Sequence, residues 1–212
     1  MDKIRRTLLT SIALLPLVAR AQQPGEGVAY STLKNELPLE STGKVEVAEF
    51  FWYGCIHCYN LEPLLEKWVP RLPADTSFRR IPAVFNERWA HDASIFYAFE
   101  VLGVLEKLHR PFFDSIHKDG LKTDRPAALG EWLTKNGLEP QKFEATMKSF
   151  GVQSKAKRAA QLTAASRIDG TPALMVQGRY TISADQGKSR EGMLATADAL
   201  AGMVRKSLAG RK

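Results

Sequence analysis

The chain has 212 residues, a formal net charge of +7 and only two cysteines. Two cysteines are too few for a scaffold of structural disulfides, and a chain of this length builds a hydrophobic core without one. The basic residues are scattered except for the run from Lys155 to Arg158, which we interpret as a solvated helix face. The composition therefore gives no indication of a nucleic-acid-binding protein.

Residues 1–21 have the pattern of an export signal. Three basic residues precede an apolar run from Leu8 to Val18, and Ala19-Arg20-Ala21 is a small-x-small cleavage site. The run is shorter than the roughly 20 residues of a membrane-spanning helix, so an uncleaved anchor is the lesser alternative. No later stretch is apolar for long enough to span a membrane. Removal of the signal leaves a net charge of +4, and export predicts an oxidising compartment.

An apolar run from Val45 to Phe51 predicts a buried strand. Cys55-Ile56-His57-Cys58 follows it, and the residues after Cys55 predict a helix that ends near Trp68. A cysteine at the start of a helix faces free backbone N–H groups and the positive end of the helix dipole, which both favour the thiolate. A Cys-x-x-Cys in this setting is typical of a reversible redox disulfide.

The rest of the chain alternates between strands and helices. Thr76 to Ile81 predicts a second strand, and apolar residues then recur at helical spacing through residues 86–150. After a further helix over 152–168, the sequence Asp169-Gly170-Thr171-Pro172 is a sharp break. A short strand at 173–176, a two-residue turn and a strand at 179–182 predict a hairpin, and 190–208 predicts a closing helix.

A strand, a Cys-x-x-Cys that opens a helix, a Gly-Thr-Pro before a β-hairpin and a closing helix together resemble the thioredoxin fold. With the helical block, Glu49-Phe50-Phe51, the histidine of the motif and the export signal, the chain resembles the DsbA family of periplasmic thiol:disulfide oxidoreductases. The resemblance covers nearly all of the chain after the signal. One departure is Ile56, where the best-known members have proline, so the oxidising strength is less firmly implied than the fold.

The resemblance implies an α/β protein, with a thioredoxin-fold domain at 22–85 and 151–212 and a helical insertion at 86–150. It implies an enzyme of the periplasm that donates its Cys55–Cys58 disulfide to reduced, unfolded, newly exported proteins. A quinone-linked membrane protein of the DsbB kind would restore the disulfide. We expect a monomer that needs no cofactor and no metal.

Cys55 is the predicted nucleophile, because a lowered thiol pKa stabilises its reduced form. Each pKa unit is worth about 30 mV toward the oxidising side. Cys58 lies one turn further along the same helix face, so we expect it to be more buried and to act as the resolving thiol. His57 lies between them, where its ring would stabilise the Cys55 thiolate or else only tune the site sterically.

Glu49 is a charged residue within an apolar strand, and a buried carboxylate is costly unless it has a partner or a role. By the resemblance, it is the acid beneath the active site that helps to move protons at Cys58. The alternative is a surface carboxylate on an edge strand, since Glu46 shows how easily a face of this strand could be wet. Arg79 or Arg80 would pair with Glu49, and strand parity does not say which.

The resemblance also implies that the Thr171–Pro172 bond is cis and faces the cysteines, where it presents backbone groups to an extended substrate. The side chain of Thr171 would then modulate redox poise and partner choice. Trp52, Tyr53 and Phe85 are candidates for an apolar rim that binds unfolded chains, with core packing as the alternative for Trp52.

Other aromatic and histidine residues receive a structural interpretation. Trp89 is expected in the core of the helical block. The three histidines outside the motif have no neighbours in the sequence that indicate a ligand set, so we expect structural or surface positions for His91, His109 and His117.

Two other functions stay open. The first is a reductase or an isomerase on the same fold, although known isomerases of this fold usually add a dimerisation domain, for which there is no room before Tyr30. The second is a structural or zinc-binding module that uses Cys55, His57 and Cys58. Zinc normally takes four ligands, commonly from two separated pairs, and only one pair is present.

Overall fold

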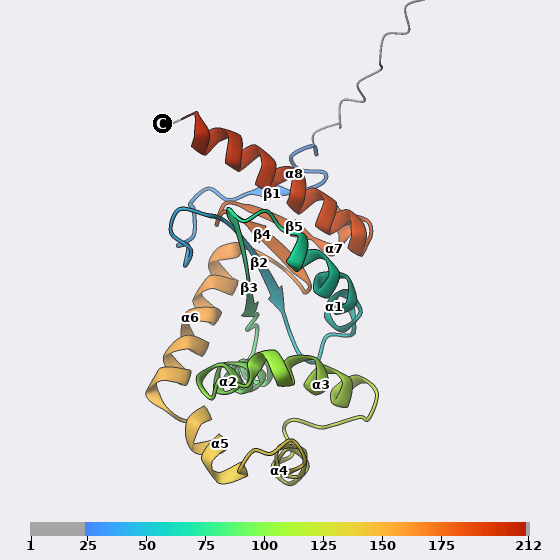
Figure 1. The fold of residues 1–212 in the computed structure, drawn as a ribbon, viewed down its shortest axis with the longest axis vertical. Helices are drawn as coiled ribbons and strands as arrows, with labels where there is room; N and C mark the ends of the chain where they lie inside the picture. The colour runs from blue at the N-terminus through green and yellow to red at the C-terminus, as the bar shows by residue number, and fades with distance from the viewer. Residues whose placement is uncertain (1–23, 211–212) are drawn as a thin grey trace, which may run out of the picture.

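The computed structural model describes residues 24–210, so the predicted signal peptide lies outside the described residues. A five-stranded sheet with helices on both faces forms one part of the molecule, and further helices form a second part beyond one end of the sheet (Figure 1). The strand order is β1-β5-β4-β2-β3, and only β2 and β3 run parallel. In this order the strands span Ser31–Thr32, Tyr180–Ser183, Ala173–Val176, Val45–Phe51 and Thr76–Pro82.

Strand β2 lies between β4 and β3, and all seven of its residues are buried. Side chains alternate across a strand, so its residues supply two cores. Val47 packs into the core shared with α1 (Ile56–Trp68) and α8 (Arg190–Ala209), while Phe50 faces α6 (Phe150–Ser166) on the other side. Any charged residue in β2 therefore needs a partner within the protein.

Helices α2 to α5 bury a largely aromatic core of their own. They span Glu87–Val101, Leu105–His117, Pro126–Lys135 and Pro140–Met147. At its centre, the ring of Phe99 contacts the rings of Phe112, Trp132 and Phe143. Phe51, the last residue of β2, belongs to this cluster too. The central strand therefore ends where the two parts of the molecule meet.

The predicted strand at 45–51 and the helix end at Trp68 are confirmed. The hairpin differs by one residue, because Gln177 and Gly178 have positive φ angles of 55° and 60° and the turn continues through Arg179. The predicted division between the insertion and the last segment at residues 150–151 stays a prediction, since α6 contacts both α2 and β3. Two short helical segments, Val69–Arg71 and Ala184–Gly187, complete the elements of the described chain.

Within residues 24–210, no helix combines the length and the apolar character that crossing a bilayer requires.

Candidate active site

Cys55 is the N-cap residue of α1. Its backbone is extended, with φ −88° and ψ 113°, and the backbone N–H of Cys58 donates a hydrogen bond to its sulfur across 3.3 Å. Both cysteines are free thiols; Cys55 is partly exposed, whereas Cys58 has no exposed surface. The start of the helix thus presents one sulfur to solvent and buries the other, as the sequence predicts.

The two sulfurs differ in acidity. Hydrogen bonding from Cys58, together with the side chain of Thr171 and the backbone N–H of His57, lowers the pKa of Cys55 to about 5 against the opposing effect of burial. Burial raises the pKa of Cys58 well above its usual value, and the nearby Cys55 and Glu49 add to this effect. At neutral pH, Cys55 is therefore a thiolate and Cys58 a thiol.

The loop between α6 and β4 contacts the sulfur of Cys55. The Thr171–Pro172 bond is cis, as the resemblance implied, and the carbonyl oxygen of Thr171 lies 3.3 Å from the sulfur of Cys55. Pro172 is buried and Thr171 is partly exposed. Two segments that are far apart in the sequence therefore meet at the exposed sulfur.

His57 is exposed at the surface of α1. The group through which it lowers the pKa of Cys55 is its backbone N–H. A role for the imidazole ring therefore stays a prediction.

Glu49 is fully buried under α1, and the alternative of a solvated carboxylate on an edge strand is wrong. The sequence could not exclude it because the order of the strands was unknown. The residue beside it is Arg80, which is its register partner on β3 and whose Nε lies 3.5 Å from Oε2 of Glu49. Arg79 points to the other face, where it pairs with Glu46 at 2.9 Å.

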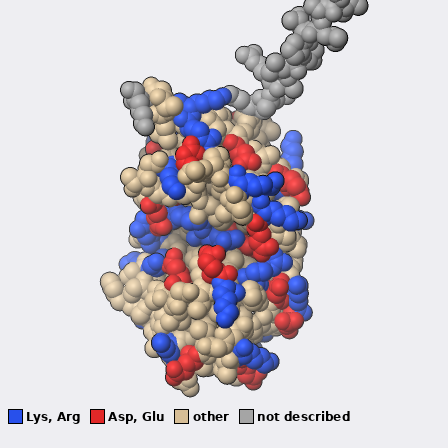
Figure 2. Space-filling model, viewed as in Figure 1, with Lys and Arg blue, Asp and Glu red and all other residues tan. Residues whose placement is uncertain are grey.

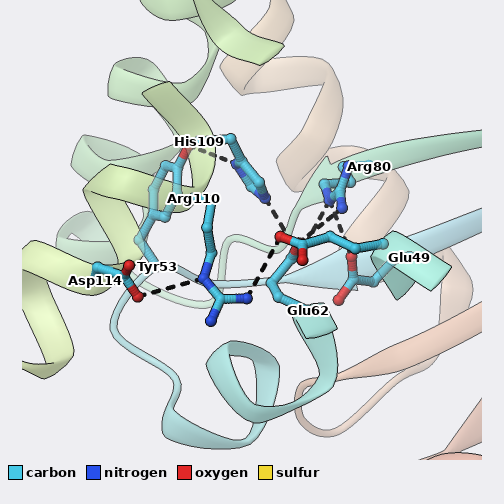
Figure 3. A network of polar contacts seen from close by, with 8 residues as sticks. Glu49, Tyr53, Glu62, Arg80, His109, Arg110 and Asp114 are labelled. Atoms are coloured by element: carbon cyan, nitrogen blue, oxygen red, sulfur yellow. Dashed lines mark hydrogen bonds and ion pairs between the residues drawn. The ribbon is translucent and has the colours of Figure 1, made fainter. Parts of the chain in front are cut away.

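Glu49 belongs to a buried polar network beneath the cysteines (Figure 3). Arg80 donates two hydrogen bonds to Glu62 of α1, across 2.8 and 3.2 Å. His109 of α3 lies 3.3 Å from the same carboxylate, and its other ring nitrogen lies 2.9 Å from the hydroxyl of Tyr53. Neither oxygen of Glu49 has a hydrogen-bond partner in the structure.

Burial and partners set the charges in this network. Burial raises the pKa of Glu49 well above its usual value, and the charge of Glu62 raises it further despite the opposing effect of Arg80. Burial also opposes ionisation of Glu62, but its contacts with His109 and Arg80 outweigh burial and lower its pKa. Burial lowers the pKa of His109. The surroundings therefore favour the protonated form of Glu49, whereas Glu62 is ionised at neutral pH.

Comparisons with known proteins agree with this geometry. The DSBA-like thioredoxin domain family matches residues 46–197. The thiol:disulfide interchange protein DsbA of Azotobacter vinelandii is 38% identical over 194 residues, which cover 90% of this chain and 91% of that protein. The crystal structure of Pseudomonas aeruginosa DsbA is similar, with a TM-score of 0.81 at 34% identity over 89% of this chain and 97% of that chain. The chain belongs to the DsbA family.

Reduced DsbA1 from Neisseria meningitidis is also similar, with a TM-score of 0.74 at 31% identity over 87% of this chain and 97% of that one. Like other members of the DsbA family, the protein is a thiol:disulfide oxidoreductase with a thioredoxin fold and an α-helical elaboration. Its Cys-x-x-Cys motif is formed by Cys55 and Cys58.

The aromatic surface beside the DsbA motif differs from the expectation. Trp52 is partly buried; its ring stacks on Trp89 with centroids 4.3 Å apart, and its Nε1–H donates to Asp92 across 2.8 Å. Trp89 is also partly exposed and meets Phe85 edge-on; it packs against the core that contains Phe50, so its expected place in the core of the helical block is wrong. Tyr53, expected in the rim, is 1% exposed and belongs to the core of the helical part.

Two residues of the buried network were missed from the sequence. Glu62 had a signal, because it lies four residues after Cys58 on the face of α1 that also carries Leu61 and Leu65. A charged residue on a buried helix face indicates a partner or a role. His109 had no comparable signal, because its contacts with Tyr53 and Glu62 join segments that are distant in the sequence.

Over residues 24–210, no three or more His, Cys, Asp or Glu side chains gather in an arrangement that could hold a metal ion. Cys55, His57 and Cys58 do not form such a group.

Proposed function

We propose that this DsbA-family enzyme is a periplasmic dithiol oxidase that donates its Cys55–Cys58 disulfide to reduced, unfolded, newly exported proteins. The observation that carries the proposal is the difference between the two sulfurs: the pKa of Cys55 is about 5, while burial raises the pKa of Cys58. A thiolate that is stable in the reduced enzyme makes the disulfide a ready donor, and each pKa unit is worth about 30 mV in that direction.

The proposed reaction begins when a substrate thiolate attacks the sulfur of Cys55. A bond forms between these two sulfurs, the Cys55–Cys58 bond breaks, and Cys58 takes the electron pair. Glu49, which holds a proton in the buried network, protonates the Cys58 sulfur, and solvent later returns the proton to Glu49. Cys58 keeps this proton because its own pKa is high.

A second substrate thiolate then attacks the substrate sulfur of the mixed disulfide. The substrate disulfide forms, and Cys55 leaves as a thiolate that hydrogen bonding to Cys58 stabilises. Two substrate thiols lose two electrons and two protons; the enzyme retains both electrons and the proton on Cys58, and the other proton enters solvent. The low pKa of Cys55 therefore favours this last step, because it makes Cys55 a good leaving group.

Thr171, Pro172 and Trp52 are proposed to bind the substrate. The carbonyl of Thr171 lies beside the nucleophile, which supports strand-like pairing of an extended chain with this loop. Trp52 and Trp89 supply an apolar surface next to it. We propose His57 as a further stabiliser of the Cys55 thiolate, through its ring.

Turnover needs an oxidant for the reduced pair. By the family resemblance, the proposed oxidant is a quinone-linked membrane protein of the DsbB kind. The nucleophile, the resolving thiol, the loop of Thr171 and the acid all come from one chain, which supports a monomer.

The test is the equilibrium of the Cys55–Cys58 pair with glutathione. We expect a potential well above the roughly −270 mV of thioredoxin, and rapid disulfide transfer to a reduced, unfolded protein. Cys55→Ser should abolish transfer. When the Cys55 thiolate of Cys58→Ser attacks a disulfide-bonded substrate and releases one substrate thiolate, the mixed disulfide should stay trapped because the resolving thiol is missing. A thioredoxin-like potential would instead favour the reductase. Membranes that contain a DsbB-like protein should reoxidise the reduced enzyme, and membranes without it should not.

A further inference from the structure

The buried network contains two carboxyl groups and one permanent positive charge. Glu49 is 0% exposed and Glu62 is 1% exposed, and Arg80 lies within ion-pair distance of both. One guanidinium compensates one carboxylate, and a second buried carboxylate without its own cation is strongly disfavoured. One proton is therefore shared between the two groups at neutral pH, and the geometry decides which group holds it.

Hydrogen bonds favour ionisation of Glu62 over Glu49. Glu62 accepts two hydrogen bonds from Arg80, and Nε2 of His109 lies 3.3 Å from its Oε1. Glu49 has only the 3.5 Å approach of Arg80, and neither of its oxygens has a hydrogen-bond partner. Donors that favour the charged form lower a carboxyl pKa, so the proton stays on Glu49.

The tautomer of His109 follows from its two partners. A carboxylate accepts hydrogen bonds but cannot donate them, so Nε2 of His109 carries the hydrogen toward Glu62. Nδ1 then accepts from the hydroxyl of Tyr53 across 2.9 Å. Burial lowers the pKa of His109, so the ring acts as a neutral donor at pH 7. Tyr53 is itself held by aromatic contacts with Phe112 and Phe113.

We propose that His109 is a positioning residue for the proton that Cys58 needs: its hydrogen bond keeps Glu62 ionised on Arg80 and thereby keeps the shared proton on Glu49. The role concerns the location of the proton in the reduced enzyme. Its effect on catalysis rests on the proposed function, in which Glu49 protonates the leaving Cys58.

Other charges face this network from the side away from the cysteines. A cavity of about 660 Å³ is lined by Glu62, Arg80 and His109 together with Glu66 of α1 and Glu106 and Arg110 of α3. Figure 2 shows blue and red side chains gathered across the middle of one face of the molecule, between its two parts. Arg110 forms ion pairs with Glu66 and Asp114. The ion pairs described for Glu62 are those with His109 and Arg80, and these two define the charge state of Glu62.

The proton can be located by infrared spectroscopy of the reduced protein at pH 7, through the C=O band of a protonated carboxyl group. A proton on Glu49, whose oxygens have no hydrogen-bond partner, should give a band at high frequency, whereas a proton on Glu62, which accepts from Arg80, should give a band at lower frequency. We expect the high-frequency band in the wild type and a shift to lower frequency in His109→Leu. Glu49→Gln leaves one carboxylate for one guanidinium and should remove the band. If His109→Leu keeps the wild-type frequency, His109 does not direct the proton and the proposal is overturned.

Two further variants separate this role from a structural one. His109→Gln keeps an N–H donor for Glu62, so its C=O band should have the wild-type frequency. His117→Leu changes the same helix at a ring that contacts the carbonyl of Tyr53, and should leave the band unchanged. If His109→Leu does not fold, Tyr53→Phe removes the partner of Nδ1 instead and should also move the band to lower frequency. An unchanged frequency would again overturn the proposal.

The kinetic consequence is a lower single-turnover rate of disulfide transfer to a reduced peptide. We expect His109→Leu to lower this rate about 10-fold at pH 7 and to shift the acid limb of its pH profile, while His109→Gln stays near wild type. The infrared measurement needs no substrate. An enzyme that donated no disulfides would therefore contradict the proposed function and leave the role of His109 to be decided by the band alone.

Discussion

Glu46 and Glu49 lie three residues apart on β2 and are both almost fully buried, at 1% and 0% exposure, yet their surroundings differ. Glu46 accepts a hydrogen bond from Arg79 at 2.9 Å and from the backbone N–H groups of Glu40 and Ser41 at 2.8 and 3.0 Å. Glu49, on the opposite face, accepts none.

This difference teaches that burial alone does not mark a functional carboxylate. A satisfied carboxylate such as Glu46 holds a loop against the sheet through fixed hydrogen-bond partners. An unsatisfied one such as Glu49 is costly as an anion and so retains a proton, which makes it useful next to a leaving thiolate. The contrast between the two carboxylates leads to four predictions.

The largest effect should follow from the loss of the satisfied carboxylate. Glu46→Leu should destabilise the fold by about 3 kcal/mol, because it leaves Arg79 and two backbone N–H groups without their main acceptor. Denaturant unfolding of the oxidised protein measures this loss. The glutathione equilibrium should stay unchanged, and a shifted equilibrium would mean that Glu46 also acts on the sulfurs.

Glu49→Gln should have the opposite effect on stability. The pKa of Glu49 is raised in the folded protein, so its contribution to stability is present below the unfolded pKa of about 4.3 and is lost as pH rises toward the folded pKa. Glutamine avoids that loss, and the variant should gain of the order of 1 kcal/mol per pH unit above pH 5. Disulfide transfer should slow by at least 10-fold. A variant that was neither stabilised nor slowed would remove the contrast with Glu46.

The next effect concerns the stability of the reduced enzyme relative to the oxidised one. The folded pKa of Cys55 is about 5, below the unfolded value near 8.5, so its stabilising effect is complete above pH 8.5 and is lost as pH falls through 5. The change should stay below about 1.4 kcal/mol per pH unit, because the sulfur is partly exposed. Denaturant unfolding of both redox forms between pH 4 and 9 tests this. Cys55→Ser is the control: it cannot form the disulfide, and its stability should lack the pH dependence that comes from the Cys55 thiolate.

The smallest effect should come from His57→Ser. The ring is exposed, and the backbone N–H that lowers the pKa of Cys55 remains in the variant. We expect the pKa of Cys55 to rise by less than about one unit, and the potential to fall by less than about 30 mV. Thiolate absorbance titration measures the shift. An increase of several units would mean that the imidazole, rather than the buried groups, governs the reactivity of Cys55.

Much of the fold and the centre of the site could be predicted from the sequence. The run from Val45 to Phe51 and the motif after it combine local signals of strand, helix start and reactive thiol. Local pattern was also sufficient for the break at Thr171-Pro172, although its cis bond and its approach to Cys55 came from the resemblance.

The remainder of the site depends on contacts that no local pattern contains. Arg80 could be chosen over Arg79 only once the parallel register of β2 and β3 was known. Tyr53 was expected in the rim, and His109 was expected in a structural or surface position without a named partner, because the two residues meet only where α3 packs against the end of β2. Similarly, Trp89 followed a helical pattern of burial, but the stack with Trp52 holds it near the surface.

The stack of Trp52 on Trp89 has a consequence for the architecture. Trp52 follows the central strand and Trp89 belongs to α2, so the aromatic wall beside the reactive sulfur is assembled from both parts of the molecule. Asp92 of α2 fixes the orientation of the indole from the helical side. A version of this enzyme that kept only the sheet and its flanking helices would retain the sulfurs but lose Trp89, so the two parts of the molecule build this aromatic surface jointly.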